Sequence, residues 1–255
     1  MLTAITRAVS PGLAKCELSF ISREPIDMEK ARRQHGAYEQ LLESLGVRVV
    51  SLPAEPSLPD SMFVEDPALV LDELAVIFPL GTPSRGPEGP ALAKALSRFR
   101  KLEFISLPAT LEGGDVLRVG RRLFVGRSRR SNPQGIRELA RIVQPWDYQV
   151  VPVAVSGCLH LKSAVTHLGG ETLLANRSWF DPAPLAGFDF IDVPGSEPQA
   201  ANALALPCTV VFPTAFPKTR AGLESRGFHV TPLDISELQK AEAGLTCSSL
   251  LFDAP

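Results

Sequence analysis

The feature that most constrains the fold is a repeated order of elements: two apolar runs around a short polar turn, then a helix, then a third apolar run. In the clearest copy, the apolar runs 68–71 and 74–78 flank two acidic residues. Apolar residues at helical spacing follow in 90–100, and an apolar run ended by proline follows in 103–108. Two apolar runs around a polar turn predict a β-hairpin, and the helical spacing predicts an amphipathic helix. The segment therefore predicts a hairpin–helix–strand unit.

The same order recurs along the chain, and the last copy is split between its two ends. Further copies are expected at 115–152, at 163–194 with a first strand at 163–166 and a weak helix, and at 203–232. The fifth copy would take its first strand from 247–252 and its remaining elements from 3–53. Such repeats predict a ring, and pairing of the last strand with the first would remove exposed strand edges. We expect an α/β fold built as a ring of five units in a single domain, residues 1–255; an open α/β sheet is the alternative.

Composition excludes several classes of protein. The 255 residues include 26 Lys and Arg against 28 Asp and Glu, a formal net charge of −2, and 45% are hydrophobic. This hydrophobic content excludes a disordered chain, and the balanced charge argues against binding to nucleic acid or to an anionic membrane. No run approaches the roughly 18 apolar residues of a membrane span, and no signal peptide is recognisable. We therefore expect a cytoplasmic protein with reduced thiols.

Cys247 is the candidate nucleophile among four cysteines that form no C-x-x-C pair. It lies where a loop enters the last expected strand, and His160 precedes a strand at the equivalent position of another repeat. A nucleophilic thiol needs a partner for proton transfer. Because equivalent strand entries converge on the axis of a ring, we expect the two side chains to be neighbours. The alternatives are a buried structural cysteine at Cys247 and a zinc site at Cys158 and His160.

Acidic residues occupy two further strand entries. Glu112 precedes two glycines that allow a tight turn, and its carboxylate could orient an imidazole and raise the pKa of that imidazole. Glu65 and Asp66 precede another apolar strand. Adjacent carboxylates can bind guanidinium, a planar cation with five donors. Arg85 and Arg130 each follow an expected hairpin, where they could reach a substrate carboxylate.

Five segments, taken in their order and spacing, resemble the dimethylarginine dimethylaminohydrolase family of the pentein superfamily. They are Phe63–Asp66, Leu111–Asp115, Val125–Asn132, His160–Ser163 and Leu245–Ser248. The resemblance covers nearly the whole chain. It implies a five-bladed α/β propeller, in agreement with the repeat. It also implies hydrolysis of Nω-methylated arginines to citrulline and dimethylamine or methylamine.

The resemblance also implies roles for individual residues. Cys247 would attack the substrate and form a covalent S-alkylthiouronium, His160 would be the general acid and base, and Glu112 would orient His160. The implied substrate ligands are Glu65 and Asp66 for the guanidinium, Asp60 with the backbone carbonyls of Leu18 and Ala241 for the α-amino group, and Arg85 and Arg130 for the α-carboxylate. The segment around Leu18 would be a mobile lid. No metal or other cofactor is required, and the expected partner is a small guanidino substrate; a homodimer stays open.

The sequence allows two alternatives to this function. The first is a compact arginine deiminase or amidinotransferase of the same superfamily. Arginine deiminases resemble this chain but have an aspartate two residues after the catalytic histidine, where this chain has Lys162. Loss of that carboxylate favours N-methylated substrates over arginine. The second is a non-catalytic propeller that binds another macromolecule, against which the combination of Cys247, His160 and Glu112 argues.

Overall fold

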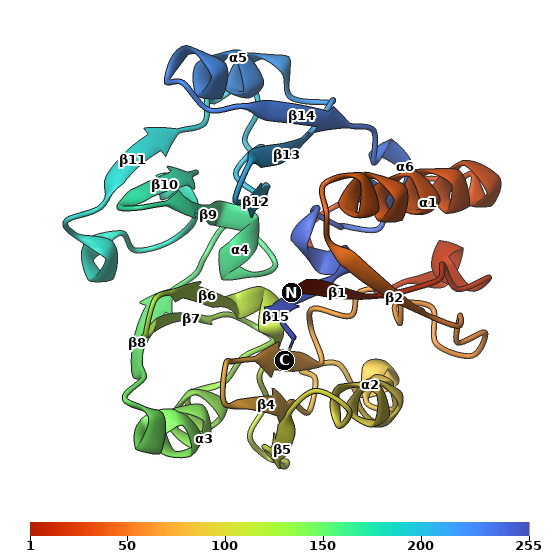
Figure 1. The fold of residues 1–255 in the computed structure, drawn as a ribbon, viewed down its shortest axis with the longest axis vertical. Helices are drawn as coiled ribbons and strands as arrows, with labels where there is room; N and C mark the ends of the chain where they lie inside the picture. Colours follow the sequence, from red (N-terminus) through yellow and green to blue (C-terminus); the bar gives the residue numbers. More distant parts are fainter. Residues whose placement is uncertain (255) are drawn as a thin grey trace.

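The computed structural model describes residues 1–254, which form five three-stranded sheets arranged around a common centre (Figure 1). In each sheet the first two strands in blade order are antiparallel, and the second and third are parallel. The blades are β3(Ala68–Val70)–β4(Leu74–Ile77)–β5(Lys101–Phe104), β6(Val116–Val119)–β7(Arg122–Arg127)–β8(Gln149–Ala154), β9(Val165–Gly169)–β10(Thr172–Ala175)–β11(Asp189–Asp192), β12(Leu204–Leu206)–β13(Thr209–Pro213)–β14(Val230–Leu233) and β15(Leu250–Asp253)–β1(Leu2–Arg7)–β2(Arg48–Leu52). The predicted five-bladed α/β architecture is confirmed.

A helix joins the second and third strands in four of the blades and lies on the outside of the ring (Figure 1). These helices are α1(Met28–Ser44), α2(Glu88–Leu96), α3(Pro133–Val143) and α5(Pro217–Ser225). Helix α3 begins where the Asn132 side chain accepts a hydrogen bond from the Gly135 amide, and it buries one face with Ile136, Leu139 and Val143. In the blade of β9–β11 only two 3₁₀ turns, Arg177–Trp179 and Ala183–Leu185, take this place, as the weak helical pattern predicts.

The two ends of the chain complete one blade together. Strand β1 pairs with β15 on one side and with β2 on the other. The Ala254 amide donates to the Met1 carbonyl at 2.9 Å, which extends this pairing by one residue. The predicted pairing of the last strand with the first is therefore confirmed.

The core is divided among the junctions between blades. Each of five buried apolar clusters contains residues from two neighbouring blades, including a cluster that joins the blade of β12–β14 to that of β1 through Ala4, Val211 and Leu245. Residues of the five first strands, β3, β6, β9, β12 and β15, line a central hollow of about 320 Å³. Burial at every junction holds the ring together and brings the entries of these strands to one place.

Several expected boundaries were wrong, including that of the helix expected in 90–100, which is α2 and ends at Leu96. The strand expected at 103–108 is β5, which ends at Phe104 because its parallel partner β4 ends at Ile77. The strands expected from 163 and 247 begin later, after the helical turns α4(Leu161–Ala164) and Thr246–Ser248. A short helix, α6(Ser236–Gln239), has no counterpart in the repeat. None of the helices in the described part of the chain is long and apolar enough to cross a membrane.

Candidate active site

Functional side chains lie at the same place in every blade, in the turn that leads into the first strand. The residues at these entries are Glu65 and Asp66 before β3, Glu112 before β6, His160 before β9, Asn202 before β12 and Cys247 before β15. These residues contact one another between different blades. Residues separated by up to 182 positions therefore form one cluster, as shown by the Glu65 amide, which donates to the Cys247 carbonyl at 3.4 Å.

His160 and Glu112 form a buried pair. The Nε2 atom of His160 lies 2.7 Å from Oε2 of Glu112, and the two side chains are 5% and 0% exposed. The other carboxylate oxygen of Glu112 accepts hydrogen bonds from the Gly81 amide and from Arg130. Gly114 makes room for the imidazole, since a Cβ there would lie 2.5 Å from Nδ1 of His160. Nδ1 is consequently the ring nitrogen left for chemistry.

The electrostatics of this pair favour a cationic imidazole. Burial alone would lower the pKa of His160, but the charge of Asp66, the hydrogen bond to Glu112 and the charge of Asp115 raise it to about 9. Burial opposes ionisation of Glu112 as well. Its contacts with His160, Arg85 and Arg130 outweigh burial and lower its pKa to about 2. At neutral pH the pair is therefore an imidazolium and a carboxylate.

Asp66 presents one buried oxygen without a partner. Its Oδ2 accepts a hydrogen bond from Arg85 at 2.9 Å, whereas Oδ1 has no hydrogen-bond partner and lies 3.9 Å from Nδ1 of His160. Buried oxygens of this kind are rarely left unsatisfied. Oδ1 of Asp66 is therefore suited to accept a hydrogen bond from a bound cation next to His160.

Glu65 differs from Asp66 because both of its oxygens are engaged. Oε1 pairs with the ammonium group of Lys162, and Oε2 accepts a hydrogen bond from the Thr246 hydroxyl at 2.8 Å. Burial raises the pKa of Glu65 in spite of Lys162. Glu65 thus connects the turn that follows His160 with the turn that contains Cys247.

Asn202 makes a second connection between the same two turns. Its side-chain amide donates to the Lys162 carbonyl and to the Thr246 hydroxyl, and its oxygen accepts from the Thr246 amide. Gly244 lies against it, since a Cβ at Gly244 would lie 2.3 Å from the Asn202 side chain. Asn202 is not among the residues predicted from the sequence, although its place at the entry to the fourth repeat is a signal that identifies it.

Cys247 lies in the turn before β15, half-buried, and its Sγ accepts a hydrogen bond from the Gly244 amide at 3.4 Å. Burial raises the pKa of the thiol strongly, and the charges of Glu65 and Asp66 raise it further. The thiol is therefore protonated while the site holds no cation. A positive group placed beside it would favour the thiolate.

The remaining candidate residues lie around the segment Glu17–Arg23, hereafter the covering segment. Both oxygens of the buried Asp60 accept from the Glu17 amide at 3.2 Å. Arg130 donates to the Ser19 hydroxyl at 3.2 Å as well as to Glu112. Leu18 and Ala241 pack in the same apolar cluster as Cys247. The structure thus brings the predicted substrate ligands to the rim of the cluster around His160.

Asp66, Glu112 and His160 also offer donor atoms within 4.8 Å of one another, as a metal site would. Two features oppose that use. Glu112 is already bonded to His160, and the guanidinium of Arg85 lies between both carboxylates, at 2.9 Å from Asp66 and 3.9 Å from Glu112. Arg85 thereby supplies the positive charge that a metal would bring.

Comparison with known proteins agrees with this geometry. Residues 18–175 match the model of a family described as N,N dimethylarginine dimethylhydrolase, eukaryotic. The N(G),N(G)-dimethylarginine dimethylaminohydrolase of Pseudomonas aeruginosa is 34% identical over 228 residues, covering 89% of this chain and 90% of the relative. The chain belongs to the dimethylarginine dimethylaminohydrolase family. The resemblance inferred from the sequence is confirmed.

Solved structures of dimethylarginine dimethylaminohydrolases support the assignment. A Cys-to-Ser mutant of the P. aeruginosa protein complexed with citrulline has a TM-score of 0.93 at 31% identity and covers 98% of both chains. A His-to-Gly variant of a dimethylarginine dimethylaminohydrolase, solved as an adduct with S-methyl-L-thiocitrulline, has the same TM-score at 32% identity and covers 98% of this chain and 99% of its own. Both similarities extend over the whole propeller.

Within this dimethylarginine dimethylaminohydrolase fold, Glu88 is a further residue that the sequence argument missed. It binds Nε and Nη2 of Arg85 with both oxygens, at 3.0 and 2.9 Å, while Nη1 of Arg85 binds Asp66. Arg85 and Glu88 are both buried. Arg85 and Glu88 are three residues apart, a spacing that places two side chains next to each other on a helix, and this spacing is the signal in the sequence that could have revealed their contact.

We expect Arg85→Ala to destabilise the protein, because it leaves the carboxylates of Glu88 and Asp66 buried without their cation. Breaking a buried ion pair by removing one partner costs about 3–5 kcal/mol. Chemical denaturation should show a loss of this size, and Arg85→Lys should recover part of it. An unchanged free energy of unfolding in Arg85→Ala would contradict this account of the buried cluster.

Proposed function

We propose that this protein hydrolyses Nω-methylated arginines to citrulline and methylamine or dimethylamine. The observation that carries the proposal is the unpartnered Oδ1 of Asp66 beside the buried His160–Glu112 pair. This arrangement offers an acceptor for a guanidinium next to a proton donor, with Cys247 as the neighbouring nucleophile. The P. aeruginosa relative bears the name of this activity, and its Cys-to-Ser variant was solved with citrulline.

In the first half-reaction Asp66 accepts an N–H of the guanidinium and directs its central carbon towards Cys247. The bound cation favours loss of the thiol proton to solvent, because His160 already carries a proton at neutral pH. The thiolate forms a C–S bond, and the C–N bond to the methylated nitrogen breaks. His160 donates its Nδ1 proton to the departing amine. The product on the enzyme is an S-alkylthiouronium on Cys247.

In the second half-reaction a water molecule attacks the same carbon. The neutral His160 now accepts a proton from this water at Nδ1, so it acts first as acid and then as base. The C–S bond breaks, and the electron pair returns to the sulfur of Cys247. The second proton of the water leaves the hydroxyl group as the carbonyl of citrulline forms, and it returns to the thiolate or to solvent. Citrulline is released. Glu112 holds the imidazole through Nε2 in both half-reactions, which fixes the direction of Nδ1.

The rest of the substrate would be held at the rim of the site. We expect Asp60 and the backbone carbonyls of Leu18 and Ala241 to bind the α-amino group. We expect Arg130, which also contacts the covering segment, to carry most of the affinity for the α-carboxylate. Arg85 has most of its donors on Glu88 and Asp66, so its larger role is to position Asp66.

Arg130→Ala should therefore raise KM for dimethylarginine with a smaller effect on kcat. Loss of a charged hydrogen-bond partner is worth about 1.5–3 kcal/mol, which corresponds to roughly a tenfold to hundredfold change in binding. Steady-state kinetics with agmatine-type analogues that lack the carboxylate provide the comparison, since their KM should rise much less; a part of any rise reports the lost contact with Ser19. An unchanged KM for dimethylarginine would place the carboxylate elsewhere.

Substrate preference gives the direct test of the proposed reaction. Lys162 takes one oxygen of Glu65 and Thr246 takes the other, so Asp66 is the carboxylate left for the guanidinium. A site that binds one side of the guanidinium can accept methyl groups on the other. We expect N-methylarginine to be hydrolysed at least about tenfold faster than arginine, within the range in which pockets discriminate by a methyl group.

The experiment is a competition between equal concentrations of N-methylarginine and arginine. Methylamine should be the main product, with little ammonia. If ammonia predominates, the chain is a compact arginine deiminase. Formation of no citrulline from either compound would favour a non-catalytic binding protein.

The pH dependence of kcat should follow His160. Because the cationic imidazole donates the proton to the amine, kcat should fall as the pH rises through the pKa of His160, which is about 9. Glu112→Gln removes the anionic partner of His160, so its pKa should fall and the decline in kcat should move down by about one to two pH units. A decline at the same pH in Glu112→Gln would show that another group titrates.

A further inference from the structure

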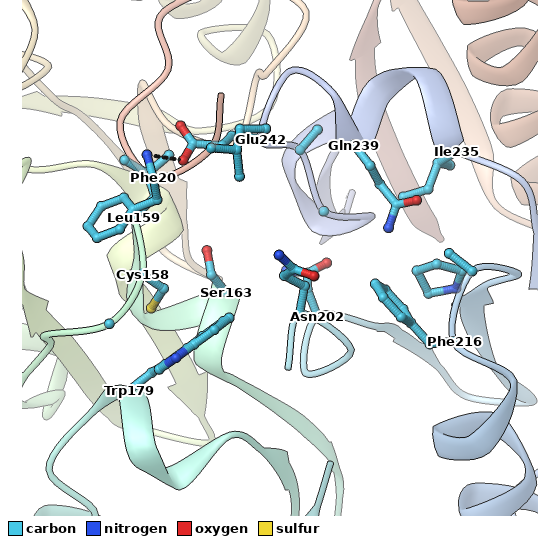
Figure 2. Close-up of a pocket in the computed structure, with 17 residues that line it drawn as sticks. Phe20, Cys158, Leu159, Ser163, Trp179, Asn202, Phe216, Ile235, Gln239 and Glu242 are labelled. Carbon is cyan, nitrogen blue, oxygen red and sulfur yellow. Dashed lines mark hydrogen bonds between the residues drawn. The ribbon is translucent and has the colours of Figure 1, made fainter. Parts of the chain in front are cut away.

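The carboxylate of Glu242 holds the middle of the covering segment, in addition to the contacts of Asp60 with Glu17 and of Arg130 with Ser19. Oε2 of Glu242 accepts a hydrogen bond from the Ser19 amide at 2.7 Å, and Oε1 accepts one from the Phe20 amide at 2.6 Å. Figure 2 shows Glu242 and Phe20 in contact at the edge of a pocket whose walls include Trp179 and Phe216. This pocket has a volume of about 390 Å³. Phe20 and Ile21 of the covering segment form part of its wall.

Glu242 has a backbone conformation that glutamate rarely adopts. Its φ is +59°, in the left-handed region, although it is not a glycine. Such a conformation persists where surrounding contacts compensate for its cost. The contacts that hold it are backbone hydrogen bonds at the end of α6, where the Ala243 amide donates to the Leu238 carbonyl and the Glu242 amide donates to the Gln239 carbonyl.

Glu242 also belongs to the loop that leads to the nucleophile. Two residues later, the Gly244 amide donates to the sulfur of Cys247, and Gly244 lies against Asn202. The residue before Glu242 is Ala241, whose carbonyl is one of the expected ligands of the α-amino group. A change in the backbone at Glu242 would therefore move both a substrate ligand and the hydrogen bond to the thiol.

We propose that Glu242 is a positioning residue that latches the covering segment over the site and couples this closure to the loop before Cys247. The kinetic part of the proposal rests on the proposed function, whereas closure of the segment does not. Hydrogen bonds to a charged acceptor are stronger than those between neutral groups, so a single carboxylate can hold two backbone amides at once. Opening of the segment breaks both bonds and frees the Glu242 side chain, which extends from the loop that carries the Ala241 carbonyl and the Gly244 amide.

Two variants distinguish the effect of losing the Glu242 carboxylate from the effect of its backbone conformation. Glu242→Gln keeps the size of the side chain but replaces one acceptor oxygen by an NH₂ group that faces an amide donor. Glu242→Gly removes the carboxylate but adopts positive φ without cost, so its melting temperature should equal or exceed that of the wild type. Glu171→Gln is the matched control, because Glu171 is exposed in a hairpin turn of another blade and carries the same charge.

Amide hydrogen exchange of the protein without substrate tests the latch. Exchange in the peptide covering 17–23 should be about tenfold or more faster in Glu242→Gln and Glu242→Gly than in the wild type and in Glu171→Gln. Exchange in β1 and β15 should not change. Wild-type exchange rates in both Glu242 variants, with the fold intact, would overturn the proposal.

Kinetics with dimethylarginine test the coupling. KM should rise about tenfold in Glu242→Gln, with a smaller change in kcat, because substrate escapes more readily from beneath an open segment. Faster exchange with an unchanged KM would disprove the coupling to the site. A wild type that releases no citrulline would contradict the proposed function, while the exchange experiment would still decide whether Glu242 is a latch.

Discussion

Replacing Cys247 by serine is expected to leave the fold intact and to reduce kcat by about 10⁴-fold or more, the size of effect found when one member of a nucleophile–base unit is removed. The reason is that a serine hydroxyl is far less acidic than a thiol. His160 is already protonated near neutral pH and cannot take the hydroxyl proton. The bound cation can lower the pKa of a thiol enough for attack, but not that of an aliphatic alcohol.

Citrulline release under saturating dimethylarginine gives the measurement, and the melting temperature shows whether the fold is kept. Cys208→Ser is the matched control, since Cys208 is an exposed free cysteine and its loss should not affect turnover. Binding of dimethylarginine to Cys247→Ser should remain measurable by calorimetry. Appreciable citrulline production by this variant would remove Cys247 from the mechanism.

His160→Gly should lower kcat by about 10²–10⁴-fold, the usual contribution of a general acid or base. Without the Nδ1 proton the amine departs poorly, and without the neutral imidazole the attacking water is not activated. With a substrate whose leaving group needs no proton, the first half-reaction should still proceed. The covalent S-alkylthiouronium on Cys247 should then accumulate.

Mass spectrometry of the intact protein after incubation with S-methylthiocitrulline should detect this adduct, because methanethiol is a good leaving group. A histidine-to-glycine variant in the same family was solved as an adduct with that compound. His229→Gly provides the control, since His229 is exposed and outside the cluster. Normal turnover of dimethylarginine by His160→Gly would exclude His160 as the acid and base.

Much of the fold and the centre of the site could be predicted because both follow from the repeat. Alternation of hairpins and helices is a local property of the sequence, and a ring places equivalent strand entries together. The repeat therefore predicts that Cys247, His160 and Glu112 lie close together. Asn202 stands at the equivalent strand entry of the fourth repeat, so the same geometry predicts that it lies near these residues.

Partnerships between long side chains could not be predicted in this way. Lys162 stands where an arginine deiminase has an aspartate, and the sequence predicts an effect only from the loss of that carboxylate. In the structure the ammonium group of Lys162 also pairs with Oε1 of Glu65. The sequence predicts that Arg85 binds substrate, but it does not predict that Glu88 binds Nε and Nη2 of the same side chain. Each pairing depends on which rotamers fit a buried space once the backbone has formed. A spacing in the sequence shows that such groups are close, and only the packed structure shows how their charges are shared.

The pairing of β1 with β15 has a consequence for synthesis of the chain on the ribosome. Strand β1 is translated before β2 to β14, but its antiparallel partner β15 emerges only after every other blade has been translated. Until then β1 keeps one open edge, and β2 alone protects the other. Cys247 emerges immediately before β15, so the segment that completes the last sheet also delivers the thiol. A nascent chain that already contains the residues from Asp60 to His160 therefore lacks the proposed nucleophile until its final sheet can form.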